Sequence, residues 1–207
     1  VSQNWPDRSP VTLHTLATLM ISISDNSATD TLIRIIGQKK LAGIVKAAGH
    51  HDPDELPVHE NRRDKYLAAD PTERERLLTK YDRALTLDSI DPRILTNKPN
   101  FINQLEWFAT PADIVRLLAY LHKSASADTR AILAINPGIG QDAARKWAYF
   151  GYKGGSEPGV LAYNFLLRSK TGKTYAVTVN WNNEEQSLQE SELLALTTRL
   201  INLLGEE

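Results

Sequence analysis

The sequence predicts an α/β fold of the α+β type, in which a helical lobe is followed by a three-stranded antiparallel meander and a closing helix. Three observations lead to this prediction. Apolar residues recur at spacings of three and four through much of the first two-thirds of the chain, which is typical of helices with one buried face. Residues 147–181 hold three short runs rich in aromatic and aliphatic side chains, which favour strands. Residues 187–204 return to the helical period.

The first three predicted helices follow one another closely. Residues 12–22 form the first pattern. A second pattern begins after the triplet Ser24-Asp25-Asn26 and runs to Gly37, a residue type that often ends helices. Its apolar side is formed by Ala28, Leu32, Ile35 and Ile36. A third covers residues 40–48. The triplet is therefore expected to form a tight turn between two helices.

Two further helix starts are predicted from capping residues. The segments Asp70-Pro71-Thr72-Glu73 and Thr110-Pro111-Ala112-Asp113 each place a capping side chain before a proline, with an acidic residue three positions after the cap. Residues 50–64 are rich in Pro, Asp, Glu and His and have no period, so we expect a long surface loop there.

The sheet is expected to be a meander of neighbouring strands. The predicted strands are residues 147–152, 160–167 and 174–181. Lys170-Thr171-Gly172-Lys173 supplies a tight turn between the second and third, which makes that pair antiparallel. The whole chain, 1–207, is expected to form one domain, with a helical lobe over 12–145 and a lobe of sheet and helix over 146–207.

Composition excludes several classes of function. The 24 basic and 25 acidic residues leave a net charge of −1 with no long basic run, so nucleic acid is not an expected partner. Arg116 and Arg199 interrupt the longest apolar stretches, which fall short of the ~20 residues of a membrane span. The chain has no cysteine, and its 5 histidines lack ligand spacing, so neither a metal nor any other cofactor is expected.

The triplet Ser24-Asp25-Asn26 is the sharpest chemical signal. A serine hydroxyl at such a turn can pass a proton between a nearby amine and a leaving nitrogen, and an asparagine amide can both donate to and accept from a substrate amide. A helix end followed by an Asp or Asn cap is the commoner explanation of the bare triplet. The flanking residues 20–30 extend the match, however, and this segment resembles the S-D-N motif of class A β-lactamases and penicillin-binding proteins.

That resemblance implies a further Lys-Thr-Gly or Lys-Ser-Gly motif on a strand beside the site. The literal match at Lys170 has only one strand and one helix after it, whereas Lys153-Gly154-Gly155-Ser156 has two strands and the closing helix, which is the family order. Lys153 and Ser156 are therefore expected to bind a substrate carboxylate. A plain Lys-Gly-Gly turn is the alternative.

The two glycines of this motif have different consequences. Gly155 is expected to let the backbone approach the ligand, and by resemblance the backbone N–H of Ser156 forms one arm of an oxyanion hole. Gly154 departs from the family pattern, because it removes the hydroxyl that usually helps to hold the carboxylate. Either Ser156 takes that role or the specificity has shifted.

The family's first motif, S-x-x-K, is missing. No serine of the chain is followed by lysine three positions later, and only 23 residues precede Ser24. In the family that motif holds the nucleophile and lies before S-D-N. We therefore expect a truncated domain that lacks the nucleophile and the N-terminal strands and is inert by itself. The uncovered sheet should pair with another copy, swap an element or leave an apolar patch exposed.

Glu60 is a candidate for the base that activates the deacylating water in class A enzymes. It lies 34 residues after Asn26, close to the family's spacing, but residues 59–63 do not reproduce the E-x-x-L-N pattern. A solvated acidic side chain in a polar loop is the alternative interpretation.

The resemblance implies a serine hydrolase that forms an acyl-enzyme with a β-lactam or a related peptidoglycan-like amide. The expected catalytic residues are Ser24, Asn26, Lys153 and Glu60, and the expected substrate-binding residues are Asn26, Lys153, Gly155 and Ser156. Such a protein would be periplasmic or secreted and would confer antibiotic resistance. A non-catalytic pseudo-enzyme that binds ligand, and a DD-peptidase or esterase of the same superfamily, remain alternatives.

Overall fold

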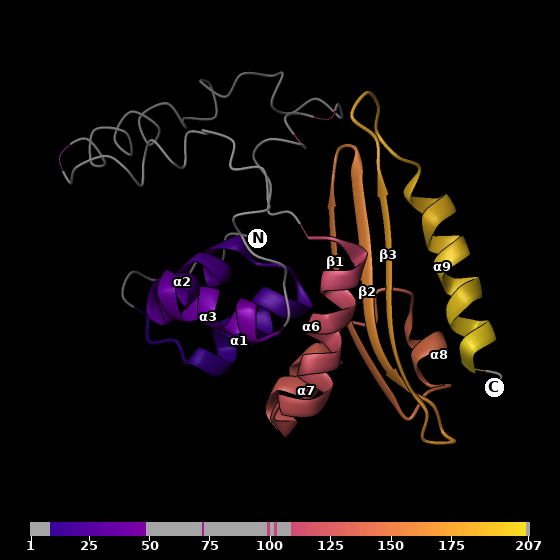
Figure 1. The fold of residues 1–207 in the computed structure, drawn as a ribbon, viewed down its shortest axis with the longest axis horizontal. Helices are drawn as coiled ribbons and strands as arrows, with labels where there is room; N and C mark the ends of the chain where they lie inside the picture. Colours follow the sequence, from indigo (N-terminus) through magenta and orange to yellow (C-terminus); the bar gives the residue numbers. More distant parts are fainter. Residues whose placement is uncertain (1–8, 49–71, 73–98, 100–101, 103–108, 206–207) are drawn as a thin grey trace.

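The computed structural model describes residues 9–48, 72, 99, 102 and 109–205 (Figure 1). Its helices are α1 (Leu13–Ser22), α2 (Asn26–Ile36), α3 (Gln38–Ala47), α6 (Pro111–Ser124), α7 (Ala127–Leu133), α8 (Gln141–Ala144) and α9 (Glu190–Gly205). Its strands are β1 (Tyr149–Glu157), β2 (Val160–Arg168) and β3 (Thr174–Asn182). The expected loop at 50–64 lies outside the described residues, as does the expected cap at 70–73 except for Thr72.

The three strands form an antiparallel sheet in the order β1-β2-β3, which confirms the predicted meander. Helices α6 and α7 lie along one face of the sheet, and α9 lies along the other (Figure 1). Helices α1, α2 and α3 form a separate group beyond α6 (Figure 1). The sheet is thus the middle layer. Its edge strand β1 contacts α7, and α7 in turn contacts α1 of the helical group.

The larger core lies between the sheet and α9. Phe165 of β2 is fully buried. Its ring packs edge-on against Phe150 with centroids 5.7 Å apart, and in a tilted arrangement against Tyr152 at 5.0 Å. Such aromatic pairs add to the free energy gained by burial alone. The buried members of this cluster are Trp147, Phe150, Leu161, Tyr163, Phe165, Leu167, Leu193 and Ile201.

A smaller core joins the opposite face of the sheet to the helices. Leu166 of β2, Leu118 of α6 and Leu133 of α7 are buried together, and Ile21 of α1 packs against them. Because residues alternate along a strand, Leu166 faces these helices while its neighbours Phe165 and Leu167 face α9. Through Ile21, this core fixes the end of α1 against the sheet.

The predicted helices are present, with differences in detail. Helix α3 starts at Gln38, two residues before its predicted start, and α9 starts at Glu190 rather than near Ser187. Ile35 and Ile36, which the pattern placed on the buried face of α2, are 57% and 38% exposed. Helices α7 and α8 were not predicted individually, because elements of 7 and 4 residues are too short to show a period.

The first strand runs further than the sequence suggested. The apolar run predicted a strand over residues 147–152, whereas β1 continues to Glu157 and includes the Lys153-Gly154-Gly155-Ser156 segment. The chain turns at Gly159, which has φ +83°, a conformation that favours glycine. The glycines weaken the strand only locally, because β2 pairs with every residue from Tyr149 to Glu157.

Part of the described surface is apolar, as expected. Leu196, Leu200 and Leu203 of α9 are 65%, 40% and 55% exposed, and among the described strands β3 forms an edge of the sheet. These residues fit the exposed apolar patch that the sequence suggested. Pairing with another copy of the chain stays a prediction.

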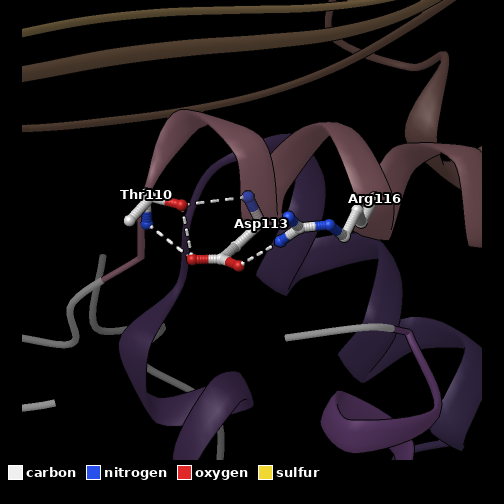
Figure 2. Close-up of polar contacts among 3 residues, drawn as sticks. All are labelled: Thr110, Asp113 and Arg116. Atoms are coloured by element: carbon white, nitrogen blue, oxygen red, sulfur yellow. Dashed lines mark hydrogen bonds and ion pairs between the residues drawn. The ribbon is translucent and has the colours of Figure 1, made fainter. Parts of the chain in front are cut away.

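The start of α6 is fixed by a capping box, which confirms the prediction from Thr110-Pro111-Ala112-Asp113 (Figure 2). The Thr110 hydroxyl accepts from the Asp113 backbone N–H at 3.2 Å, and the Asp113 carboxylate accepts from the Thr110 backbone N–H at 2.9 Å. The same carboxylate accepts from the Thr110 hydroxyl at 2.6 Å and pairs with Arg116 at 2.8 Å. Asp113 is only 5% exposed, whereas its partners Thr110 and Arg116 are exposed, so the carboxylate is the buried end of these contacts.

Replacing Asp113 with alanine is expected to lower the free energy of unfolding by about 2 kcal/mol, because it removes half of the capping box and the ion pair with Arg116. Urea denaturation followed by circular dichroism measures the change. Asp142→Ala is the matched control, since Asp142 pairs with Arg145 at the same spacing but both side chains are largely exposed. Equal stability losses in the two variants would contradict the structural role given to Asp113.

Candidate functional site

The turn between α1 and α2 displays two side chains and buries the third. Asp25 is 2% exposed, and its carboxylate accepts from the Ala28 backbone N–H at 2.8 Å, so it caps α2. Ser24 and Asn26 on either side of it are exposed. Ser24 has φ +54°, an uncommon conformation for a residue other than glycine. A strained backbone conformation persists only where the surrounding structure stabilises it, and residues in such conformations are concentrated at functional sites.

The edge strand brings a lysine to this turn. The ammonium group of Lys153 donates to the Ser24 hydroxyl at 2.7 Å, across 129 positions of sequence, and it also contacts the Gly154 carbonyl. Burial lowers the pKa of Lys153 below the 10.5 of a free lysine, because desolvation disfavours the charged form. A lysine that releases its proton more readily, hydrogen-bonded to a hydroxyl, can exchange a proton with a reacting group.

Polar residues of the sheet hold this lysine's backbone in place. The Asn164 amide donates to the Lys153 carbonyl at 3.0 Å, and the Thr178 hydroxyl donates to the Asn164 side-chain oxygen at 2.6 Å. The three residues are directly opposite one another on the three strands. Sequence reasoning missed Asn164 and Thr178, although each is a polar interruption in an apolar strand run.

The loop between α7 and α8 supports the turn from another side. The Asn136 amide donates to the Ser22 carbonyl at 2.9 Å, and its side-chain oxygen accepts from the Gly138 backbone N–H at 3.0 Å. Asn136 thereby joins the C-terminal end of α1 to the loop. This residue was also missed, and no local pattern distinguishes it from an ordinary turn asparagine.

The remaining predicted site residues are placed less closely. Asn26, Gly155 and Ser156 are exposed, and no hydrogen bond links Asn26 or Ser156 to Ser24 or Lys153 within the described residues. By strand alternation the Ser156 side chain leaves β1 on the side opposite to that of Lys153. Glu60 lies outside the described residues.

The literal Lys-Thr-Gly match lies away from the site. Lys170, Thr171 and Gly172 are exposed in the turn between β2 and β3, as predicted. The turn is closed by backbone hydrogen bonds from Ser169 to Lys173 at 2.8 Å and from Gly172 to Ser169 at 3.0 Å. These residues therefore have a structural explanation.

In the part of the chain that the structure describes, no group of three or more His, Asp or Glu side chains is placed to hold a metal ion. Over the same residues, no helix is long and apolar enough to cross a membrane.

Comparison with known proteins gives one family and several similar folds. The profile of the beta-lactamase enzyme family matches residues 1–202. A beta-lactamase from Sphaerobacter thermophilus is 20% identical, with 97% of this chain and 65% of that one aligned at a TM-score of 0.61. For the beta-lactamase from Streptomyces albus G the identity is 18%, the shares are 95% and 64%, and the TM-score is 0.58.

A class A beta-lactamase from Bacteroides cellulosilyticus is 18% identical, with 98% of this chain and 67% of that one aligned at a TM-score of 0.59. The chain thus spans about two-thirds of the length of these structures, 64% to 67%. No curated protein matches it at a significant level. At these identities the similarity establishes the fold, which is the β-lactamase and transpeptidase type predicted from the motifs. Because the family profile covers nearly the whole sequence, the chain belongs to the beta-lactamase enzyme family.

Proposed function

We propose that this chain carries the proton-relay and carboxylate-binding part of a serine acyl-transfer site that acts on a β-lactam or a related peptidoglycan-like amide. The observation that supports it most is the 2.7 Å hydrogen bond between Lys153 and Ser24. Two motifs distant in sequence meet there, at an exposed, strained serine and a partly desolvated lysine. Both groups are suited to moving a proton.

Each retained residue has a proposed role. Ser24 relays a proton to the leaving nitrogen, and Asn26 orients the substrate amide. Lys153 attracts the substrate carboxylate, and the backbone at Gly155 and Ser156 approaches the acyl group. Glu60 is the proposed base for the deacylating water.

The nucleophile is absent from the 207 residues, because no S-x-x-K motif occurs in them. Without an activating lysine from that motif, the Ser24 hydroxyl should remain unreactive. The chain by itself is therefore proposed to bind carboxylates weakly and in a salt-sensitive manner, but not to be acylated. The complete protein would be periplasmic or secreted and would contribute to antibiotic resistance.

The missing motif also favours a second candidate, a pseudo-enzyme that binds ligand without chemistry. The two differ in whether the complete gene product supplies a nucleophile. A DD-peptidase or esterase of the same superfamily is the enzymatic variant, and it would form an acyl-enzyme that is hydrolysed slowly.

Intact-mass measurement after incubation with a chromogenic β-lactam tests the proposal. We expect no adduct and no turnover on the 207-residue chain, and an adduct on the complete gene product. An adduct on the 207-residue chain would place the nucleophile within it and refute the assignment of roles. If neither protein reacts, the pseudo-enzyme is the better description, whereas a long-lived adduct on the complete protein favours a DD-peptidase.

A further inference from the structure

The loop between α7 and α8 passes around the edge of the sheet beside the site. Helix α7 contacts β1, and its residue Leu133 belongs to the smaller core on the α6 side of the sheet. Ile139 and Ala144 pack instead against the larger core on the α9 side. Helices α7 and α8 accordingly lie on opposite sides of the sheet (Figure 1). Residues 134–140 therefore cross the edge formed by β1, the strand that carries Lys153.

On the helical side, this loop holds the C-terminal end of α1. The Ser22 carbonyl is one of the last four of the helix, which have no partner within it. The Asn136 amide donates to this carbonyl at 2.9 Å. The Asn136 side-chain oxygen accepts from the Gly138 backbone N–H at 3.0 Å, which fixes the orientation of the amide. Ser24, with its φ of +54°, follows two residues after Ser22, so Asn136 anchors the start of the turn that displays it.

On the α9 side, the same loop lies against Tyr152, the residue before Lys153. Gly138 has φ +70°, and a Cβ atom built on it would overlap the Tyr152 ring, 2.6 Å from Cε2. The ring is held from its other side, since it packs against Phe165 with centroids 5.0 Å apart and against Tyr163 at 6.4 Å. Glycine at position 138 thus allows the loop backbone to contact the strand directly before the lysine of the site.

These contacts form a closed path through the two halves of the site. Asn136 joins the loop to the turn of Ser24, Gly138 joins it to the strand of Lys153, and the 2.7 Å hydrogen bond between Lys153 and Ser24 completes the path. We infer that Asn136 is a positioning residue, which acts through Ser22 to hold the Ser24 hydroxyl at hydrogen-bonding distance from the Lys153 ammonium group. The inference rests on the proposed function, in which this pair moves a proton, because proton transfer requires such a distance.

The test follows the Lys153 ammonium signal by 1H–15N NMR in the 207-residue chain labelled with 15N-lysine. Ser24→Ala gives the reference signal of an ammonium group without its hydroxyl partner. Asn136→Asp keeps an acceptor for the Gly138 N–H but removes the donor to Ser22, and Asn136→Ser does the same without adding charge. We expect both Asn136 variants to move the signal most of the way to its position in Ser24→Ala. Asn136 is exposed, so both should fold.

Asn183→Asp is the matched control, because the Asn183 side-chain oxygen also accepts from backbone N–H groups of its own loop, those of Glu185 at 2.8 Å and Gln186 at 3.1 Å. It should leave the ammonium signal unchanged. A wild-type signal in both Asn136 variants, or a change in Asn136→Asp alone, would overturn the inference and leave the proposed function standing. If Ser24→Ala does not move the signal, the hydrogen bond that supports the proposed function is not formed, and both proposals fail.

The other end of the loop is tested with a pair of glycine variants. Gly138→Ala places a methyl group against the Tyr152 ring, whereas Gly172→Ala, at φ +92°, has nothing within 4 Å of the added carbon. Both variants carry the backbone cost of a positive φ, but only Gly138→Ala forces the loop and β1 apart. We expect Gly138→Ala to shift the Lys153 ammonium signal and Gly172→Ala to leave it unchanged. The same signal in both variants would overturn the link between the loop and the strand.

Activity of the complete gene product separates positioning from ligand binding. Asn136→Ser is expected to lower kcat for acylation by a chromogenic β-lactam by about 10- to 100-fold, the effect of misplacing a reacting group by up to about 1 Å. KM should change little, because Lys153 keeps its charge. A raised KM with an unchanged kcat would assign Asn136 to ligand binding and overturn the inference.

Discussion

Replacement of Lys153 by glutamine is expected to lower kcat/KM of the complete gene product toward a β-lactam by about 100-fold or more, the size of effect seen when a group that stabilises transition-state charge or transfers a proton is lost. The substitution removes the charge that contacts Ser24 and that is proposed to attract the carboxylate. Stopped-flow acylation with a chromogenic β-lactam measures the effect. Lys170→Gln is the matched control, because it changes the same residue type in the exposed turn. A large loss from Lys170→Gln with little from Lys153→Gln would reverse the assignment of the motif.

The role of Lys153 also sets a pH dependence. Because burial lowers its pKa, the folded protein loses this positive charge at a lower pH than the 10.5 of a free lysine. Carboxylate binding should therefore be strongest at neutral pH and weaken as the pH rises through that lowered pKa. KM should accordingly increase over the same pH range. In Lys153→Gln the increase should disappear. Persistence of the same profile in that variant would assign the titration to another group.

Truncation of Phe165 to alanine is expected to lower the free energy of unfolding by about 3–5 kcal/mol, since it opens a cavity at a fully buried position. The ring packs on Phe150 and Tyr152, so its loss also removes the support of the edge strand beside the site. Urea unfolding followed by tryptophan fluorescence measures the change.

Leu196→Ala provides the comparison for this prediction, because Leu196 is 65% exposed on α9. Its effect should stay within about 0.5 kcal/mol. If Phe165→Ala lost no more stability than Leu196→Ala, the core between the sheet and α9 would not be the main source of stability.

The sequence determined the features that depend on neighbouring residues. The capping box at Thr110 and Asp113 forms within four residues of chain, and the turn at Lys170 closes within five, so both could be predicted without a fold. The choice of Lys153 over Lys170 followed from comparing the predicted order of the strands with that of the family. The family itself was apparent from the two motifs around Ser24 and Lys153.

Only the tertiary structure decided which residues meet. Ser24 and Lys153 are 129 positions apart. Asn164 reaches the site through the pairing of β2 with β1, and Thr178 reaches Asn164 through the pairing of β3 with β2. The sequence predicted the first strand over residues 147–152, but hydrogen bonding to β2 extends it to Glu157, because a paired neighbour outweighs a weak local preference.

Periodicity likewise predicted the apolar sides of the helices without deciding what covers them, which is why Ile35 and Ile36 are exposed although their spacing suggested burial. Tyr152 is a similar case, since in the sequence it is one aromatic residue in a strand. Its contact with Gly138 depends on the approach of the loop before α8 to the sheet. Contacts of this kind are fixed by packing between distant segments, and no local pattern of residues encodes them.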